Sequence, residues 1–187
     1  MAHLQLQAPE KALQAHQTAQ TILEQSLAQH SSLLPHLQPA LAQTYGSIGK
    51  VHQSQHQYEA ALEALERAHA CLHAMYAQQP NTDLAASHNN LGLVYTQLQQ
   101  YEKALQAYQT AQSLFAQTLG PKHAHTGSCA LNAGLTLVQQ DKLSEAQQAF
   151  GRARDIWATA LGPQHEQTQM AERYAQDPAS ALSSTTS

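Results

Sequence analysis

The sequence predicts an all-α protein, an α-solenoid in which about eight helices stack as antiparallel pairs. The segment Glu10–Ala28 recurs at Glu102–Gly120, with 12 of 19 positions identical. Further copies of the pattern reduce the repeat distance to 42–43 residues through most of the chain. Within each copy, apolar residues recur at i, i+3, i+4 and i+7, the period of an amphipathic helix. No segment alternates with the two-residue period of a strand, so we expect no sheet.

One type of helix recurs four times, and it contains the pattern shared by Glu10–Ala28 and Glu102–Gly120. Its copies start at Ala12, Ala61, Ala104 and Ala146. The last three copies are 43 and 42 residues apart, whereas the first step is 49 residues. We interpret segment 30–37 as an insertion in the first connection, because it is longer than its counterparts.

These four copies are called second-type helices, because they stand second in each pair. First-type helices alternate with them, stand first in each pair and contain a glycine in constant register, at positions 49, 92 and 134. The sequence Leu-Gly-Pro-x-His follows two of the units, starting at Leu119 and Leu161. Glycine tolerates a left-handed helix end and proline cannot continue the helix, so this sequence marks a stop. These signals predict helices at residues 9–29, 38–54, 57–78, 83–97, 100–119, 126–139, 142–161 and 165–176.

The predicted helices combine into a single array over residues 1–176. The array contains a half-unit at 9–29, paired units at 38–78, 83–119 and 126–161, and a capping helix at 165–176. The array starts and ends with a half-unit, so either these helices cap the stack or the array is part of something larger. No first-type helix precedes the first helix, so we expect its outer side to be available to a partner. Residues 177–187 are small and polar, so we expect a disordered tail whose removal leaves stability unchanged.

Neighbouring helices in such a stack must share one core. Small residues are expected where the helices approach closely: Gly49, Ala68, Gly92, Ala111, Gly134 and Ala153. Larger residues are expected to fill the space between them: Tyr45, Leu65, Tyr95, Tyr108, Phe150 and Trp157.

Composition excludes several classes of function. Charged residues make up only 12% of the chain and the net charge is -4, which gives no basic patch for nucleic acid. No run of 18 apolar residues is present, so we expect no membrane insertion. The N-terminus lacks the pattern of a secretory signal, so we expect a cytoplasmic protein in which Cys71 and Cys129 are reduced thiols.

No motif for catalysis, phosphate binding or a cofactor occurs, so we expect no enzyme activity and no cofactor. Carboxylates such as Glu59, Glu102 and Glu145 stand at helix starts, where the helix dipole favours them. Histidine is unusually frequent, with 12 residues. Pairs four residues apart, such as His69 and His73, could hold a metal, but structural zinc normally needs four ligands, so we expect no metal site. The histidines of the Leu-Gly-Pro-x-His turns are expected to cap or pack.

The two helix types together resemble the tetratricopeptide signature. The positions that carry it in the second unit are His88, Leu91, Gly92, Tyr95, Ala104 and Tyr108. The step of 42–43 residues exceeds the usual value of about 34 and is similar to the long-repeat subclass of kinesin light chains. The resemblance implies a right-handed superhelix that acts as a protein-binding scaffold, with its first-type helices lining a concave groove.

Helical spacing from the packed residues Tyr45, Ile48 and His52 selects the side chains that would face this groove. They are Gln43, Lys50, Gln53, Asn89, Asn90, Leu93, Thr96, Ser128, Leu131, Asn132, Leu135 and Val138. Four of them would form an apolar floor, and the asparagines would bond to a peptide main chain. Helix 165–176 is a rival occupant of the floor, with Met170 and Tyr174 as plugs. Lys50 is the only cation in the set, which argues against a site for a terminal carboxylate.

The sequence therefore predicts a non-enzymatic protein–protein interaction module that binds a peptide or helix of a partner protein in its groove. The alternative is a permanent structural subunit of a larger assembly, without an exchangeable ligand.

Overall fold

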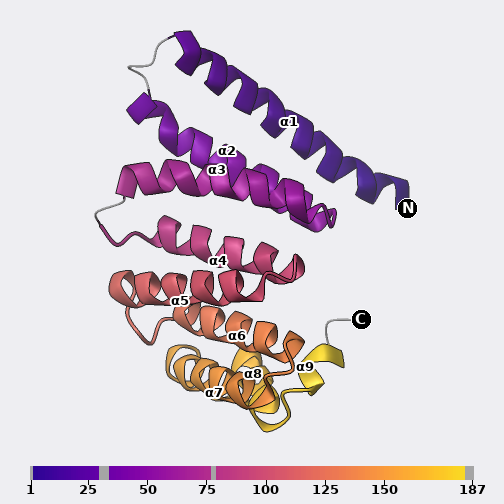
Figure 1. The fold of residues 1–187 in the computed structure, drawn as a ribbon, viewed down its shortest axis with the longest axis vertical. Coiled ribbons are helices and arrows are strands. Elements are labelled where there is room, and N and C mark those ends of the chain that lie inside the picture. The colour runs from indigo at the N-terminus through magenta and orange to yellow at the C-terminus, as the bar shows by residue number, and fades with distance from the viewer. Residues whose placement is uncertain (1, 30–33, 77–78, 184–187) are drawn as a thin grey trace. The chain divides into compact units, whose positions relative to one another are not determined.

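A computed structural model describes residues 2–29, 34–76 and 79–183 of the chain. In this part of the chain the regular structure is entirely α-helical (Figure 1), and the chain forms two compact units, Met1–Gln79 and Pro80–Ser187. The predicted fold class is confirmed as an all-α solenoid of antiparallel helix pairs. None of the described helices combines the length and the hydropathy that a membrane-spanning segment needs.

The first unit contains three helices, α1 (Ala2–Gln29), α2 (Leu34–Ser54) and α3 (Tyr58–Tyr76). Helices α2 and α3 form a pair, and α1 packs on α2. The backbone of α1 starts before the predicted residue 9, and α2 already begins within the predicted insertion. Positions 30–33 of that insertion and the predicted helix end at 77–78 lie outside the described residues.

Polar contacts reinforce the packing of α1 on this pair. The Tyr45 hydroxyl donates a hydrogen bond to Glu24 of α1. The Arg67 guanidinium lies 5.7 Å from the centre of the Tyr45 ring and 3.9 Å from the same carboxylate. These contacts lower the pKa of Glu24, mainly through the Tyr45 hydrogen bond. Beneath them, Leu23 packs on the core formed by Leu41, Tyr45 and Ala68.

The second unit contains six helices in the described residues. They are α4 (Thr82–Gln97), α5 (Tyr101–Thr118), α6 (Ala124–Gln139), α7 (Leu143–Ala160), α8 (Glu166–Gln176) and α9 (Ser180–Ser183). Two kinds of helix contact alternate along this unit. Contacts within a pair join α4 to α5 and α6 to α7, and contacts between pairs join α5 to α6 and α7 to α8.

The Leu-Gly-Pro-x-His turns both end one helix and start the next, as the sequence predicts. Gly120 and Gly162 adopt positive φ angles of 105° and 98°. The ring Nδ1 of His123 accepts a hydrogen bond from the His125 backbone N–H, at 3.2 Å. His165 caps α8 in the same way. Of the two roles expected for these histidines, capping and packing, the structure shows capping.

The glycines of the first-type helices mark the closest approach within each pair. A Cβ atom on Gly134 would lie 2.6 Å from Cε1 of Phe150, and one on Gly92 would lie 2.6 Å from Cε1 of Tyr108. Gly49 stands in the same relation to Leu65. Because real Cβ atoms essentially never come within 3.0 Å of another heavy atom, a larger residue would force the helices apart.

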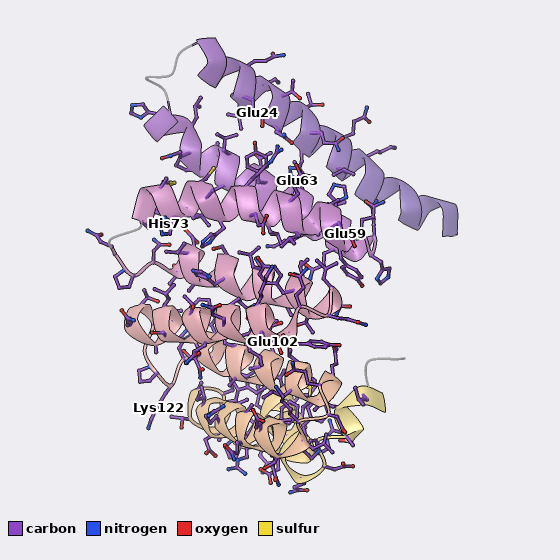
Figure 2. All side chains as sticks on the ribbon, viewed as in Figure 1. Glu24, Glu59, Glu63, His73, Glu102 and Lys122 are labelled. Carbon is purple, nitrogen blue, oxygen red and sulfur yellow. The ribbon has the colours of Figure 1, made fainter. Side chains whose placement is uncertain are left out.

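The carboxylates that sequence analysis places at helix starts are exposed there. Glu59 and Glu102, labelled in Figure 2, lie in the first turns of α3 and α5, and Glu102 accepts a hydrogen bond from the Gln140 amide at 3.1 Å. Glu145 lies likewise in the first turn of α7.

The predicted disordered tail needs correction for part of its length. Ser180–Ser183 forms the short helix α9, and its Ala181 is only 1% exposed. This methyl group packs in a cluster that contains Val138, Phe150 and Ala175. The tail is therefore anchored by an apolar contact with helices that precede it, and positions 184–187 lie outside the described residues.

Two titratable side chains are buried in the second unit. Burial raises the pKa of the Cys129 thiol from 9.0 to about 12. It also raises the pKa of the Tyr108 hydroxyl from 10.0 to about 12. Both groups are neutral at physiological pH, and charging either one would disfavour the folded state.

Two alanine substitutions should have opposite effects on stability. Gly134→Ala should lower the free energy of unfolding by about 1–3 kcal/mol, because the fully buried Phe150 ring cannot move away. Gly151→Ala should raise it by about 0.5–1 kcal/mol, because this glycine lies in a helix and has no atom within 4 Å of an added Cβ. Urea unfolding measures both values, and equal effects would contradict the close approach.

Two aspartate substitutions near the C-terminus should differ in the same assay. Ala181→Asp should detach α9 and cost on the order of 1 kcal/mol, the apolar contact of one short segment. Ala179→Asp, at an exposed position two residues earlier, should change stability by less than about 0.5 kcal/mol. Equal stability of the two variants would show that the Ala181 contact does not anchor the tail.

Stability should fall in alkaline solution. The folded-state pKa values of Cys129 and Tyr108 lie above their ordinary values, so their contribution is complete below pH 9 and is lost as pH rises toward 12. Between pH 9.5 and 11, Cys129→Ala should flatten the decline by about 1 kcal/mol per pH unit, whatever its effect at neutral pH. Urea titrations at several pH values test this, and parallel curves for variant and parent would refute it.

Candidate functional site

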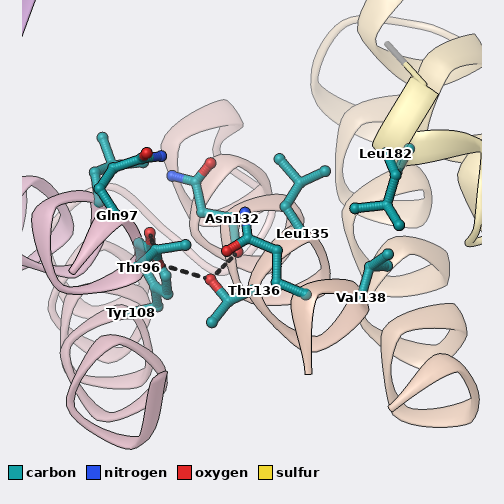
Figure 3. A pocket seen from close by; sticks show the side chains of 11 residues that line it. Thr96, Gln97, Tyr108, Asn132, Leu135, Thr136, Val138 and Leu182 are labelled. Atoms are coloured by element: carbon teal, nitrogen blue, oxygen red, sulfur yellow. Dashed lines mark hydrogen bonds between the residues drawn. The ribbon is translucent and has the colours of Figure 1, made fainter. Parts of the chain in front are cut away.

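A cavity of about 100 Å³ opens between helices of the second unit (Figure 3). Its walls come from α4, α6 and α9, and Tyr108 of α5 contributes to the lining. The lining residues are Leu93, Thr96, Gln97, Tyr108, Asn132, Leu135, Thr136, Val138, Gln139, Ala181 and Leu182. The two first-type helices α4 and α6 thus contribute most of the surface.

A hydroxyl network joins three helices beside the cavity. The Thr96 hydroxyl lies 2.8 Å from that of Thr136 and 3.1 Å from that of Tyr108. The Thr136 hydroxyl donates to the Asn132 backbone carbonyl, at 2.9 Å. One consistent proton arrangement runs from Tyr108 to Thr96, then to Thr136 and the carbonyl, so that each hydroxyl donates once. The network satisfies these buried groups and fixes the spacing of α4, α5 and α6.

Amide side chains stand at the edge of the cavity. Figure 3 shows Gln97 and Asn132 at one end and Leu182 at the other. The Asn132 amide donates to Oδ1 of Asn89 at 3.0 Å, which holds its orientation. Gln97 and Gln139 are exposed, so their amides are accessible to a ligand from solvent. Neither glutamine was among the residues predicted from the sequence.

The structure brings five of the predicted groove residues together around this cavity: Leu93, Thr96, Asn132, Leu135 and Val138. Two of the five, Thr96 and Val138, are buried, whereas residues on the surface of a groove would be exposed. Thr96 is held by the hydroxyl network, and Val138 packs in the core beside Phe150. They form the base of the cavity, whereas Leu93 and Leu135 are partly exposed.

The other predicted groove residues do not line the cavity. Leu131 packs against two core clusters, and the Ser128 hydroxyl donates to the Ala124 carbonyl at 3.2 Å. Asn89 accepts a hydrogen bond from Asn132, which lines the cavity. Asn90 is partly exposed on the same helix as Asn89. The remaining three, Gln43, Lys50 and Gln53, belong to the first unit.

The rival occupant, helix 165–176, shares clusters with the predicted floor residues Leu131 and Leu135. Its Tyr174 ring lies 5.3 Å from that of Phe150, and Met170 packs on the cluster around Trp157. Neither side chain lines the cavity. The short helix α9 borders it instead, through Ala181 and the exposed Leu182.

The histidine pair in α3 is a possible metal site by spacing alone. The rings of His69 and His73 lie 6.0 Å apart, and burial lowers the pKa of His69. Among the residues whose placement is described, no group of three or more His, Cys, Asp or Glu side chains is arranged to hold a metal ion.

Several solved structures share this fold. A putative kinesin light chain from Podosopora anserina with nearly identical TPR-like repeats has a TM-score of 0.68 at 18% identity, covering 97% of this chain and 87% of its own. Its Q17M variant gives 0.67, with the same identity and coverages of 97% and 86%. BtubC (BKLC) from P. vanneervenii gives 0.66 at 14% identity over 88% of this chain. This chain spans 63% of the BtubC length.

Sequence comparison with family models assigns the repeats. No curated protein matches the chain significantly. Two models described as tetratricopeptide repeat match residues 41–76 and 83–159, which together make up more than half of the chain. These are the segments in which glycine-marked helix pairs were found. The chain therefore belongs to the tetratricopeptide-repeat family, and its repeats resemble those of kinesin light chains.

Proposed function

We propose that the second unit binds a peptide segment of a partner protein at the cavity between α4 and α6. An apolar side chain of the peptide would insert between Leu93 and Leu135. The amides of Gln97 and Gln139 would bond to the peptide main chain beside it. The tetratricopeptide assignment supports the general class, a protein–protein interaction module without catalytic chemistry.

The composition of the cavity is the observation that carries this proposal. Leucine side chains form its walls, threonine and valine lie at its base, and glutamine and asparagine amides stand at its edge. Sites for small molecules and cofactors typically measure about 300–1,000 Å³. The volume here, about 100 Å³, suits a single side chain better than a whole cofactor.

The electrostatics of the cavity favour an uncharged ligand segment. None of the residues that line it is charged. Amides can both donate and accept hydrogen bonds, which matches the alternating groups of a peptide backbone. Binding should therefore depend on apolar burial and hydrogen bonds, and only weakly on salt.

The alternative function is a fixed subunit of a larger assembly. A fixed subunit would hold its partner permanently and would not exchange short peptides. A selection for peptide binding therefore separates the two functions.

Peptides selected from a random displayed library on the full chain should share one apolar anchor residue. Leu93→Asp should weaken their binding at least about tenfold, because the anchor would bury a carboxylate without a partner. Gln109→Asp, on an exposed position of α5, should change it less than about twofold. Titration by fluorescence anisotropy measures both affinities, after thermal melting has shown that both variants are folded.

Affinity between 0.05 and 0.5 M salt should change less than about threefold, because the cavity offers no charge to screen. A selection that yields only acidic or basic peptides, or peptides that bind the Leu93→Asp variant equally well, would reject the cavity as the binding site.

A further inference from the structure

One side of α1 is exposed to solvent. In the other second-type helices, the corresponding side packs against the first-type helix of the same pair. Helix α1 packs on α2, which is a contact between pairs like that of α5 with α6. In the described residues, no helix makes the contact within a pair with α1. Figure 1 shows α1 beside α2, with no ribbon against its other side. This side of α1 is therefore an unpartnered helix face.

The internal repeat indicates what covers such a face. Ala15, Ala19 and Ile22 of α1 correspond to Ala107, Ala111 and Leu114 of α5, in the segment where 12 of 19 residues are identical. In α5, Ala111 is fully buried in a cluster with Ala85 of α4, and Leu114 packs against the same cluster. The equivalent face of α5 is therefore covered by a first-type helix.

The same positions in α1 are open to solvent. Ala15 is exposed, Ala19 is partly exposed, and Ile22 is 58% exposed. Among the large hydrophobic residues that the structure describes, Ile22 is the most exposed. Glu24 of α1 accepts a hydrogen bond from Tyr45 and lies beside the Arg67 guanidinium. Lys11 is exposed on the same side, four residues before Ala15, and its counterpart Lys103 in α5 lies 5.5 Å from the centre of the Tyr95 ring of α4.

Helix α8 differs from the other first-type helices at the positions that contact a second-type helix. Helix α8 is of the first type, and its Gln169 and Gln176 stand where α6 has Gly127 and Gly134. Those glycines allow Trp157 and Phe150 to approach the α6 backbone. Exposed glutamines at these positions prevent a second-type helix from approaching α8. The contact positions of α8 therefore favour a partner helix other than the α1 of a second copy.

We propose that the face of α1 formed by Ala15, Ala19 and Ile22 docks a first-type helix of a partner protein, in the way that α4 docks on α5. The partner helix would present small apolar residues to the alanines. It would also carry a glycine opposite His16, since His16 corresponds to Tyr108, which approaches Gly92. This surface lies in the first unit and is separate from the cavity in the second unit.

A peptide with the sequence of residues 81–98 is a suitable probe, because it contains the α4 helix that covers the equivalent face of α5. The labelled peptide should bind the full chain saturably in fluorescence anisotropy. Ile22→Asp should weaken binding at least about tenfold, because docking would bury the new carboxylate. Gln17→Asp, exposed on the other side of α1, should have less than about a twofold effect.

A second peptide carries Gly92→Leu and serves as the matched control. Leucine favours the helix more than glycine does, so any loss of affinity reports a steric clash and not lost helicity. Its binding should fall at least about tenfold, and backbone amides of residues 11–26 should gain protection from hydrogen exchange only with the unmodified peptide. Equal binding of the two peptides, or of the Ile22→Asp and Gln17→Asp variants, would overturn the proposal. Sedimentation showing a dimer that Ile22→Asp dissociates would overturn it as well, because the occupant would then be a second copy.

Discussion

The close approach of a glycine on one helix to a large side chain on the next is the constraint on which each helix pair depends. It recurs as Gly92 against Tyr108 and as Gly134 against Phe150. Each glycine removes the one carbon atom that would separate the backbone from the ring. The aromatic side chain can then be fully buried, and the apolar area removed from water stabilises a pair that could not fold alone.

This constraint also shapes the cavity. Because Gly92 lets Tyr108 lie against α4, the Tyr108 hydroxyl reaches Thr96, which in turn contacts Thr136 of α6. The two first-type helices are therefore held by a polar bridge at their base. Above the bridge, Leu93 and Leu135 are partly exposed and leave a small apolar opening.

The helices and their close contacts could be predicted because the sequence repeats, so that each position can be compared with its counterparts in the other copies. Gly49, Gly92 and Gly134 stood in one register, and all three lie at helix contacts. The burial of Ala181 could not be predicted in this way, because the tail has no counterpart in the other repeats. The burial of two predicted groove residues could not be predicted either, since helical spacing separates the two sides of a helix but does not show how far a neighbouring helix covers each side. Thr96 and Val138 are covered by other helices and so lie deeper than predicted.

The two ends of the repeats show how one position decides between an interior helix and a terminal one. A glycine at the contact position lets a second-type helix approach, whereas Gln169 and Gln176 at the corresponding positions of α8 keep such a helix out. The corresponding side of α1 has no such polar side chains at these positions, since Ala15 and Ala19 are small and Ile22 is apolar. A glutamine can remain hydrated at a terminus, but an exposed isoleucine between alanines gains free energy when it is covered. The exposed contact positions are therefore polar on α8 and apolar on α1.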